Sequence, residues 1–278
     1  MTNSISISVV IPVFNNARST LRAVNSVLRQ TNPVLEIVLV DDASDPDCRK
    51  AIRRFINRCH SSIPIHLVQL AQNRGPGFAR HEGAKRAQGS YIAFLDADDL
   101  WHRSKLERVQ QVVEETGAEL LGHDRPWKPF ITRLCLRELP DSVRHRPLSR
   151  MDFLKRNPLP TSSIVATQPI AREMFRFGGR KAEDYMALMV ASRQARRSTY
   201  IDAPLCWALK PPFGASGEGA DQVAIYGASA KHMMRLWREK IVSGPDLLIF
   251  AGFLAVRVPV GLLRLLHYRR RYGRSGSV

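Results

Sequence analysis

A doubly wound α/β fold is the class that the first half of this 278-residue sequence predicts. Short apolar runs rich in Ile and Val alternate with segments whose apolar residues recur at helical spacing. Strands alternating with helices at such lengths indicate parallel βαβ units. Two of the apolar runs end in clusters of aspartate. Because ligands of such folds bind at the carboxyl ends of the strands, we expect the aspartates to mark the functional site.

The individual elements follow from hydrophobic periodicity. In the first hundred residues we predict strands at 5–13, 35–40, 65–70 and 91–95, separated by helices at 18–30, 49–59 and 78–88. The first helix depends on Leu21, Val24 and Leu28, which recur at i, i+3 and i+7. Farther on we predict helices at 105–115 and 183–193 and strands at 118–122, 161–166 and 200–209. Six prolines between residues 126 and 160 indicate loops and short edge elements there.

The composition is that of a basic globular protein. Lys and Arg total 42 against 25 Asp and Glu, which gives a formal charge of +17, and 44 % of the residues are apolar. This charge favours a polyanionic partner, which could be nucleic acid, an anionic membrane surface or a phosphorylated substrate. The first eight residues lack the regions of a signal peptide, so we expect a cytoplasmic protein. The four cysteines form no CxxC pair, which favours buried reduced thiols over a zinc site.

Four aspartates are candidates for metal chemistry. Asp41 follows the second predicted strand, and Asp96, Asp98 and Asp99 follow the fourth. Carboxylates gathered at one edge repel one another unless a cation neutralises them, and Mg²⁺ or Mn²⁺ prefers such oxygen ligands. The alternative is that acidic turns after strands simply cap the next helix. The presence of two such turns favours the metal site.

A glycine-rich turn opens the helix after the third strand. Residues 73–80 read NRGPGFAR, with two glycines and two arginines. Glycines let a backbone approach a phosphate closely, and helix N-termini attract anions. The pattern is neither GxGxxG nor a Walker loop. Taken alone, the turn is also compatible with a loop that binds nothing.

Together these segments resemble glycosyltransferase family 2, whose members are inverting nucleotide-sugar transferases of GT-A fold. The resemblance rests on SVVIPVFNN (8–16), IVLVDDAS (37–44), residues 73–83 and GSYIAFLDADD (89–99), and it is dense over residues 5–116. His81 departs from the family, which usually has Asn there. The resemblance implies a Rossmann-like mixed central sheet flanked by helices. It also implies a nucleotide-sugar donor, for which we expect a UDP-sugar, and an Mn²⁺ or Mg²⁺ cofactor.

The resemblance also implies a role for each matching residue. The loop under the nucleotide base would consist of Pro12, Val13, Phe14 and Asn15, and Asp41 would hydrogen-bond the base. The DxD motif at the ribose and diphosphate would be Asp96, Ala97 and Asp98, with the metal held by Asp98 and Asp99. Gly77 and Arg80 would lie close to the nucleotide.

A second signature lies in the second half of the chain. Residues 178–185 read GGRKAEDY, which resembles the family's Gly-Gly followed by Glu-Asp at a helix start. The resemblance makes Asp184 the general base that deprotonates an acceptor hydroxyl, with Glu183 beside it on the acceptor side. The alternative for Asp184 is a purely structural one, because the helix dipole favours acidic residues in a first turn.

The loop KPPFGASG at 210–217 looks like an acceptor-side or lid loop of some bacterial members, with Lys210, Gly214 and Ser216 as candidate contacts. Its glycines would permit closure over the donor. An ordinary surface turn is the alternative. Because no Gln-x-x-Arg-Trp motif follows, a processive polymer synthase is disfavoured.

The expected organisation is a nucleotide-sugar-binding half (1–116), an acceptor-binding half (117–225) and a basic amphipathic helical tail (226–278). From Lys231 onward the tail carries ten Lys and Arg against two acidic residues. Arg257, Arg264 and Arg271 are spaced by seven, which places them on one helical face. This pattern predicts an in-plane helix on an anionic membrane at the inner face of the cell membrane. The alternative is a helix packed on the protein's own core with a solvated basic face.

The leading functional hypothesis is transfer of one sugar from a nucleotide sugar to a hydroxyl of a lipid-linked or envelope glycan. A polyprenyl-phosphate glycosyltransferase is the alternative within the same class, and its phosphate acceptor would need no general base. From other classes come a basic nucleic-acid-binding protein and a non-catalytic nucleotide-binding protein. The sequence lacks an RNA-binding aromatic signature, which disfavours the former. The intact acidic set disfavours the latter.

Overall fold

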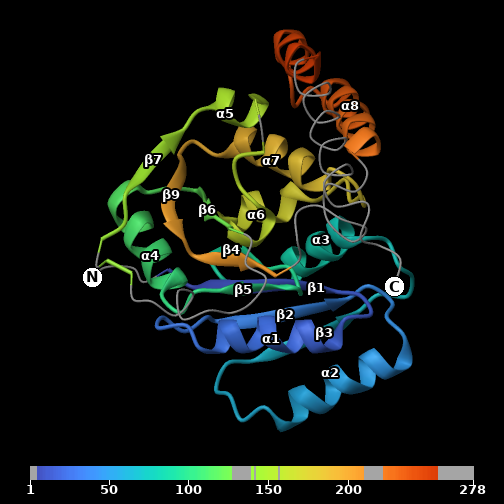
Figure 1. Cartoon of the computed structure of the whole chain (residues 1–278), viewed down its shortest axis with the longest axis vertical. Helices are drawn as coiled ribbons and strands as arrows, with labels where there is room; N and C mark the ends of the chain where they lie inside the picture. Colours follow the sequence, from blue (N-terminus) through green and yellow to red (C-terminus); the bar gives the residue numbers. More distant parts are fainter. Residues whose placement is uncertain (1–4, 127–138, 141, 156, 210–221, 256–278) are drawn as a thin grey trace, which may run out of the picture.

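The computed structural model describes residues 5–126, 139–140, 142–155, 157–209 and 222–255. Within these residues an eight-stranded mixed sheet, in the order β3-β2-β1-β4-β8-β6-β9-β7, has helices on both faces (Figure 1). The predicted α/β class with a mixed central sheet is confirmed.

The first half of the sheet is parallel. β1 (Ile7–Val13), β2 (Glu36–Asp41), β3 (Ile65–Gln69) and β4 (Tyr91–Phe94) alternate with α1 (Ala17–Leu28), α2 (Pro46–Arg58) and α3 (Pro76–Arg86). β1 pairs in parallel with β2 and β4, and β2 pairs in parallel with β3. The carboxyl ends of these strands therefore lie at one edge, as the sequence predicts.

The start of α2 differs from the prediction, because the helix begins at Pro46 instead of residue 49. Asp45 caps it by accepting a hydrogen bond from the Cys48 backbone N–H at 2.7 Å. Proline suits the first helical position, where its missing N–H would have no partner in any case. Capping chemistry thus extends the helix beyond its apolar stripe.

The second half adds strands in both directions. β8 (Val165–Thr167) is antiparallel to β4 and to β6 (Leu120–Asp124), β9 (Ser198–Pro204) is parallel to β6, and β7 (His145–Leu148) is antiparallel to β9. The helices of this half are α4 (Lys105–Thr116), α5 (Arg150–Lys155), α6 (Gln168–Met174) and α7 (Glu183–Gln194).

Two predicted strands are each divided. In the predicted strand 161–166, the first three residues, Thr161–Ser163, form a 3-10 turn, and β8 begins at Val165. Hydroxyl side chains that bond nearby backbone favour such turns over strands, and Ser163 Oγ donates to the Pro160 carbonyl at 2.7 Å. Residues 200–209 divide into β9 and β10 (Cys206–Ala208). β10 leaves the central sheet and pairs antiparallel with β5 (Asp99–Trp101), which directly follows the DxD segment.

Two apolar cores lie on opposite faces of the sheet. One packs α1, α2 and α4 on the sheet through side chains such as Val24, Ile52 and Leu106. The other packs α3, α5, α6 and α7, with Phe153 and Met189 among its buried side chains. Cys48 and Cys206 are buried free thiols as predicted, Cys59 is half-buried, and Cys135 lies outside the described residues.

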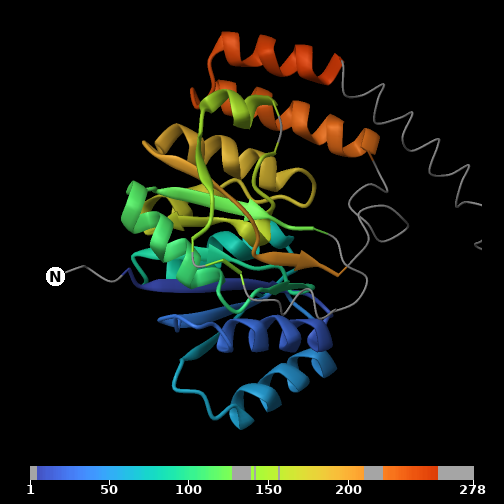
Figure 2. The same cartoon turned by 60° about the vertical axis from the view of Figure 1, so that its left-hand side comes forward.

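The described part of the C-terminal tail belongs to the second core. α8 (Gln222–Arg238) and a helix at 244–255 lie together at one end of the molecule (Figure 2). Met233, Leu236, Val242 and Phe250 are buried in that core. Up to residue 255 the tail therefore packs on the protein's own core and contacts α7, as in the alternative given above. The division of the chain at residue 226 stays a prediction. The arginines at 257, 264 and 271 lie outside the described residues.

No helix in the described ranges combines the length and apolarity needed to cross a membrane.

Candidate active site

The predicted base-binding loop and Asp41 lie side by side at the sheet edge. Val13 at the end of β1 is in register with Asp41 at the end of β2. The two following loops are joined by Asn15, whose N–H donates to Ser44 Oγ at 3.0 Å and whose Oδ1 accepts from the Asp45 N–H at 2.7 Å. Pro12 and Val13 are buried, whereas the Phe14 ring is 50 % exposed. An exposed ring at this position is available to a planar base.

Asp41 keeps a buried acceptor atom. Its carboxylate is fully buried, and Oδ1 accepts from the Ser44 N–H at 2.9 Å. Oδ2 makes no hydrogen bond within the described structure and lies 3.4 Å from Arg49 Nε. A buried oxygen with unused acceptor capacity is costly unless a ligand bonds it. The geometry is therefore suited to the predicted hydrogen bond with a nucleotide base.

The glycine-rich turn is held by a residue to which the sequence analysis assigned no role. Asp42 accepts from the Arg74 and Gly75 N–H groups, each at 2.8 Å. Gly75 has φ +91°, and a Cβ there would lie 2.6 Å from Arg180 Cγ. A Cβ on Gly77 would lie 3.0 Å from Glu183 Cγ. The glycines thus let this turn pack closely on the loop before α7. The predicted contact of Gly77 with the nucleotide stays a prediction.

Arg80 joins the two halves of the site. Its side chain is 5 % exposed, and it donates to Asp96 Oδ1 at 2.5 Å and to Glu183 Oε1 at 3.2 Å. Burial alone would lower the pKa of Arg80, but the carboxylates of Asp96, Glu183 and Asp184 raise it above its ordinary value. Arg80 is therefore a permanent cation between the DxD turn and the start of α7.

The DxD turn after β4 rests on a serine that the sequence analysis placed in a strand. Ser162 Oγ accepts from the Asp96 N–H at 3.0 Å and donates to Asp99 Oδ2 at 2.5 Å. Its carbonyl accepts from Trp101 Nε1 at 2.8 Å and from the buried Lys105 Nζ at 2.9 Å. One residue of the Thr161–Ser163 turn thus fixes both ends of the acidic segment.

The acidic residues differ in environment. Burial raises the pKa of Asp96, but Arg80 more than reverses this and holds it below its ordinary value. Burial raises the pKa of Asp99 to about 7, against the opposing charge of Arg125, whose Nη1 lies 2.9 Å from Asp99 Oδ2. Ala97 and Asp98, at the tip of the turn, are half-buried.

Three of the four aspartates lie beside a basic side chain, so a metal is not, as the sequence analysis assumes, their sole source of neutralisation. Arg80 pairs with Asp96, Arg125 pairs with Asp99, and Arg49 lies 3.4 Å from Asp41. The sequence could not show this, because the partners are 16, 26 and 8 residues away from the carboxylates. Side-chain cations supply much of the neutralisation that we had assigned to the metal alone.

A divalent metal still fits the site. Among the described residues no group of three or more His, Cys, Asp or Glu side chains is arranged to hold an ion. Mg²⁺ and Mn²⁺ sites that include substrate phosphates commonly need one or two carboxylates from the protein. Half-buried Asp98 suits that role, whereas Asp99, predicted as a second ligand, uses Oδ2 to bond Ser162 and Arg125. These bonds make Asp99 a support of the turn, and its role as a metal ligand stays a prediction.

Asp184 lies in the first turn of α7, beside Glu183. Its Oδ2 accepts from Asn157 Nδ2 at 2.6 Å, and its Oδ1 accepts from the Tyr185 N–H at 2.7 Å. The bond to Tyr185 is compatible with the structural alternative, and the bond to Asn157 orients the carboxylate. Because Glu183 bonds Arg80, the start of α7 and the DxD turn share one site. The base role of Asp184 stays a prediction.

Three positioning residues were absent from the sequence prediction, and only two left a signal in the sequence. Asp42 adjoins Asp41, and Ser162 lies in a run of three hydroxyl residues that interrupts an apolar segment. Asn157 left none. The predicted lid residues Lys210, Gly214 and Ser216 lie outside the described residues. His81, the departure from the family pattern, is half-buried, and burial lowers its pKa below the ordinary value.

Comparisons with known proteins support the fold and the family. The fold is that of GT-A glycosyltransferases. A mannosyltransferase, PcManGT from Pyrobaculum calidifontis in complex with GDP-Man and Mn²⁺, superposes with a TM-score of 0.67 at 19 % identity, covering 100 % of this chain and 77 % of that one. The S. aureus TarS 1–349 complex with UDP-GlcNAc gives 0.66 at 18 % identity, covering 90 % and 72 %.

Residues 8–166 match the family described as Glycosyl transferase family 2, and the chain belongs to that family. The amylovoran biosynthesis glycosyltransferase AmsB of Erwinia amylovora is 34 % identical over 110 residues, which cover 40 % of this chain and 36 % of AmsB. Across seven curated relatives that are 34–41 % identical, the matched segment covers 15–52 % of the relative. The chain thus matches only part of the length of each of these relatives.

Proposed function

We propose that the protein is an inverting glycosyltransferase that moves one sugar from a nucleotide sugar to a hydroxyl of a lipid-linked or envelope glycan. The observation that carries the proposal is the Arg80 bridge, which brings the DxD turn and the helix start with Asp184 to one site. Family membership supports the reaction class. The relative named for amylovoran biosynthesis supports an envelope or exopolysaccharide acceptor. A UDP-sugar is the proposed donor, as in the TarS complex with UDP-GlcNAc.

In the proposed reaction, separate residues of the site bind the base, the ribose and diphosphate, and the acceptor hydroxyl. The exposed Phe14 ring and the buried Asp41 Oδ2 would bind the base, and Arg80 would orient Asp96 toward the ribose. Mn²⁺ or Mg²⁺, held by Asp98 and the donor phosphates, would offset the charge on the departing diphosphate. Asp184 would take the proton from the acceptor hydroxyl as its oxygen bonds the anomeric carbon. The bond from that carbon to the diphosphate breaks in the same displacement, which inverts the configuration.

The proposed location is the surface of the cell membrane, where a lipid-linked acceptor is present. The support is the basic, apolar sequence after residue 240, including Arg269, Arg270 and Arg271. Anionic lipid attracts such clusters with about 1 kcal/mol per basic residue.

The reaction is tested first by a screen of nucleotide sugars for Mn²⁺-dependent hydrolysis, and then by Asp184→Asn. Loss of a positioned base lowers turnover by about 10² to 10⁴, whereas binding of the donor should not change. Asp47→Asn, an exposed aspartate in the first turn of α2, is the matched control for lost charge at a helix start. If Asp184→Asn keeps normal transfer to a hydroxyl, Asp184 is structural. If the wild type transfers sugar only to a polyprenyl phosphate, the alternative acceptor class is right.

A further inference from the structure

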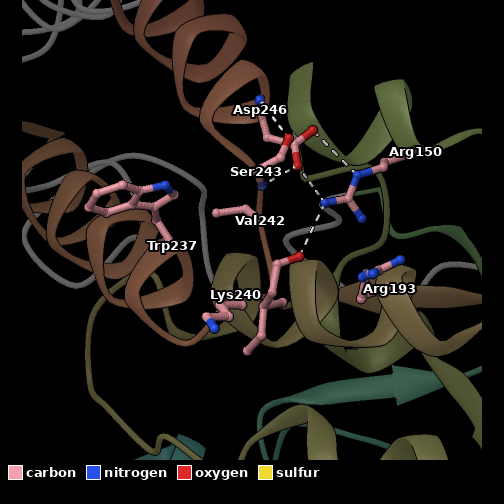
Figure 3. A pocket seen from close by; sticks show the side chains of 8 residues that line it. Arg150, Arg193, Trp237, Lys240, Val242, Ser243 and Asp246 are labelled. Atoms are coloured by element: carbon pink, nitrogen blue, oxygen red, sulfur yellow. Dashed lines mark hydrogen bonds and ion pairs between the residues drawn. The ribbon is translucent and has the colours of Figure 1, made fainter.

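A cavity of about 480 Å³ lies away from the candidate active site, where α5 and α8 meet the helix at 244–255 (Figure 3). These elements form the end of the molecule opposite α2 (Figures 1 and 2). Three basic side chains, Arg150, Arg193 and Lys240, line the cavity beside Trp237. None of the four takes part in the site described above.

Two of the three basic side chains that line the cavity make no ion pair in the described part of the chain. Arg150 donates to Asp246 at 2.7 Å and to the Ile241 carbonyl at 3.3 Å, which fixes it in the wall. Burial would raise the pKa of Asp246, but Arg150 and Ser243 lower it to about 2, so this pair stays ionised. Arg193 and Lys240 are exposed and make no ion pair within the described ranges. The cavity therefore has a net positive charge suited to an anion.

The surroundings of the cavity are apolar and exposed. The exposed fractions are 46 % for Trp237, 44 % for Met234, 39 % for Met151 and 75 % for Leu248. All four belong to the elements that line the cavity, and Met234 lies one turn from Trp237 on the same side of α8. In the rest of the described structure, Phe14 and Leu35 are the remaining exposed large apolar side chains. A free inorganic anion would use the cations but would gain nothing from this apolar rim.

Cations beside exposed Trp and Leu match the boundary between headgroups and acyl chains of an anionic membrane. We propose that the cavity binds the phosphate of an anionic phospholipid headgroup through Arg193 and Lys240. Trp237 and Leu248 then lie at the level of the first acyl carbons. This inference rests on the membrane contact of the proposed function and assigns that contact to residues before position 256.

The helix that carries Leu248 also contacts the start of α7, away from the cavity. Phe250, on the same helix as Leu248, stacks on Tyr185 with ring centroids 5.7 Å apart, and Tyr185 follows Asp184. A membrane at this end of the molecule would therefore present a lipid-linked acceptor near the start of α7.

The test is co-sedimentation of the full chain with phosphatidylcholine vesicles, with and without one quarter phosphatidylglycerol, at low and high salt. The pocket variant Arg193→Gln/Lys240→Gln should bind anionic vesicles about 30-fold more weakly, from about 1 kcal/mol per basic residue. The control Lys50→Gln/Arg54→Gln removes the same charge from exposed positions on α2 and should bind as the wild type does. Trp237→Ala should weaken binding at both salt concentrations.

A second double variant, Arg269→Gln/Arg270→Gln, separates this inference from the general membrane contact. If it alone weakens binding, the membrane contact is right and the cavity assignment is wrong. Equal losses in the pocket and α2 variants would mean that net charge alone attracts the protein, which overturns the assignment. No binding of the wild type to either vesicle would overturn the membrane contact itself. Binding of inorganic phosphate without binding to vesicles would make the cavity a free-anion site and would also overturn it.

Discussion

Replacing Arg80 with Met should destabilise the protein because it leaves two carboxylates without their cation. The Arg80 side chain is 5 % exposed, and those of Asp96 and Glu183 are 23 % and 11 % exposed. Removing one partner of a buried ion pair costs about 3–5 kcal/mol. Partial exposure of Asp96 reduces this penalty, so we expect a loss of about 3 kcal/mol in the free energy of unfolding at pH 7.5. Methionine fills much of the arginine volume, which limits any contribution from a cavity.

The loss should depend on pH in a defined direction. In the wild type Arg80 holds the pKa of Asp96 low, so its stabilisation is present above the unfolded pKa and disappears as the pH falls through the folded value. In the variant, burial without a cation should raise the pKa of Asp96 above the unfolded value. Protonation then relieves the penalty, so the difference between variant and wild type should be largest near pH 8 and smaller at pH 5.

Urea unfolding followed by tryptophan fluorescence at both pH values measures this difference. Arg54→Met, at an exposed position on α2, is the matched control and should change stability by less than about 0.5 kcal/mol. A loss below about 1 kcal/mol that is equal at pH 5 and pH 8 would refute the idea that Arg80 neutralises the site.

Three further predictions follow from the same geometry. Ser162→Ala should lower the free energy of unfolding by about 1–3 kcal/mol and weaken donor binding, because Asp99 and the Asp96 N–H lose their shared hydrogen-bond partner. Urea unfolding measures the first effect and calorimetry the second, and an unchanged donor affinity would contradict the positioning role of Ser162. Phe250→Ala should lower the free energy of unfolding by about 3–5 kcal/mol, because the Phe250 ring is buried against Tyr185. A loss under about 1 kcal/mol in urea unfolding would show that the tail is not part of the core. Calorimetry should show that donor binding needs Mg²⁺ or Mn²⁺, and equal affinity in EDTA would remove the metal from the mechanism.

Sequence patterns predicted the first half of the fold well because they reflect local physics. The strand ending in Asp41 contains the continuous apolar run 37–40, and the helix after it begins earlier than predicted because Asp45 caps its start. The predicted strand at 161–166 begins only at Val165. Before it, the Ser162 and Ser163 hydroxyls bond the Asp99 side chain and the Pro160 carbonyl, and the chain forms a 3-10 turn. The tail was predicted as a separate amphipathic element, because the apolar face that enters the core looks the same in sequence as one that enters a membrane.

The sequence by itself indicated the family, the sheet edge of the candidate site and the aspartates that follow its strands. Those features depend on short-range patterns, since an aspartate that directly follows a buried strand must lie at its carboxyl end. The tertiary structure decided which charges face one another. Arg80 meets Glu183 across 103 residues, and Ser162 meets Asp96 across 66. Periodicity along the chain does not contain such pairings, because they depend on how the two faces of one sheet are covered by helices distant in sequence.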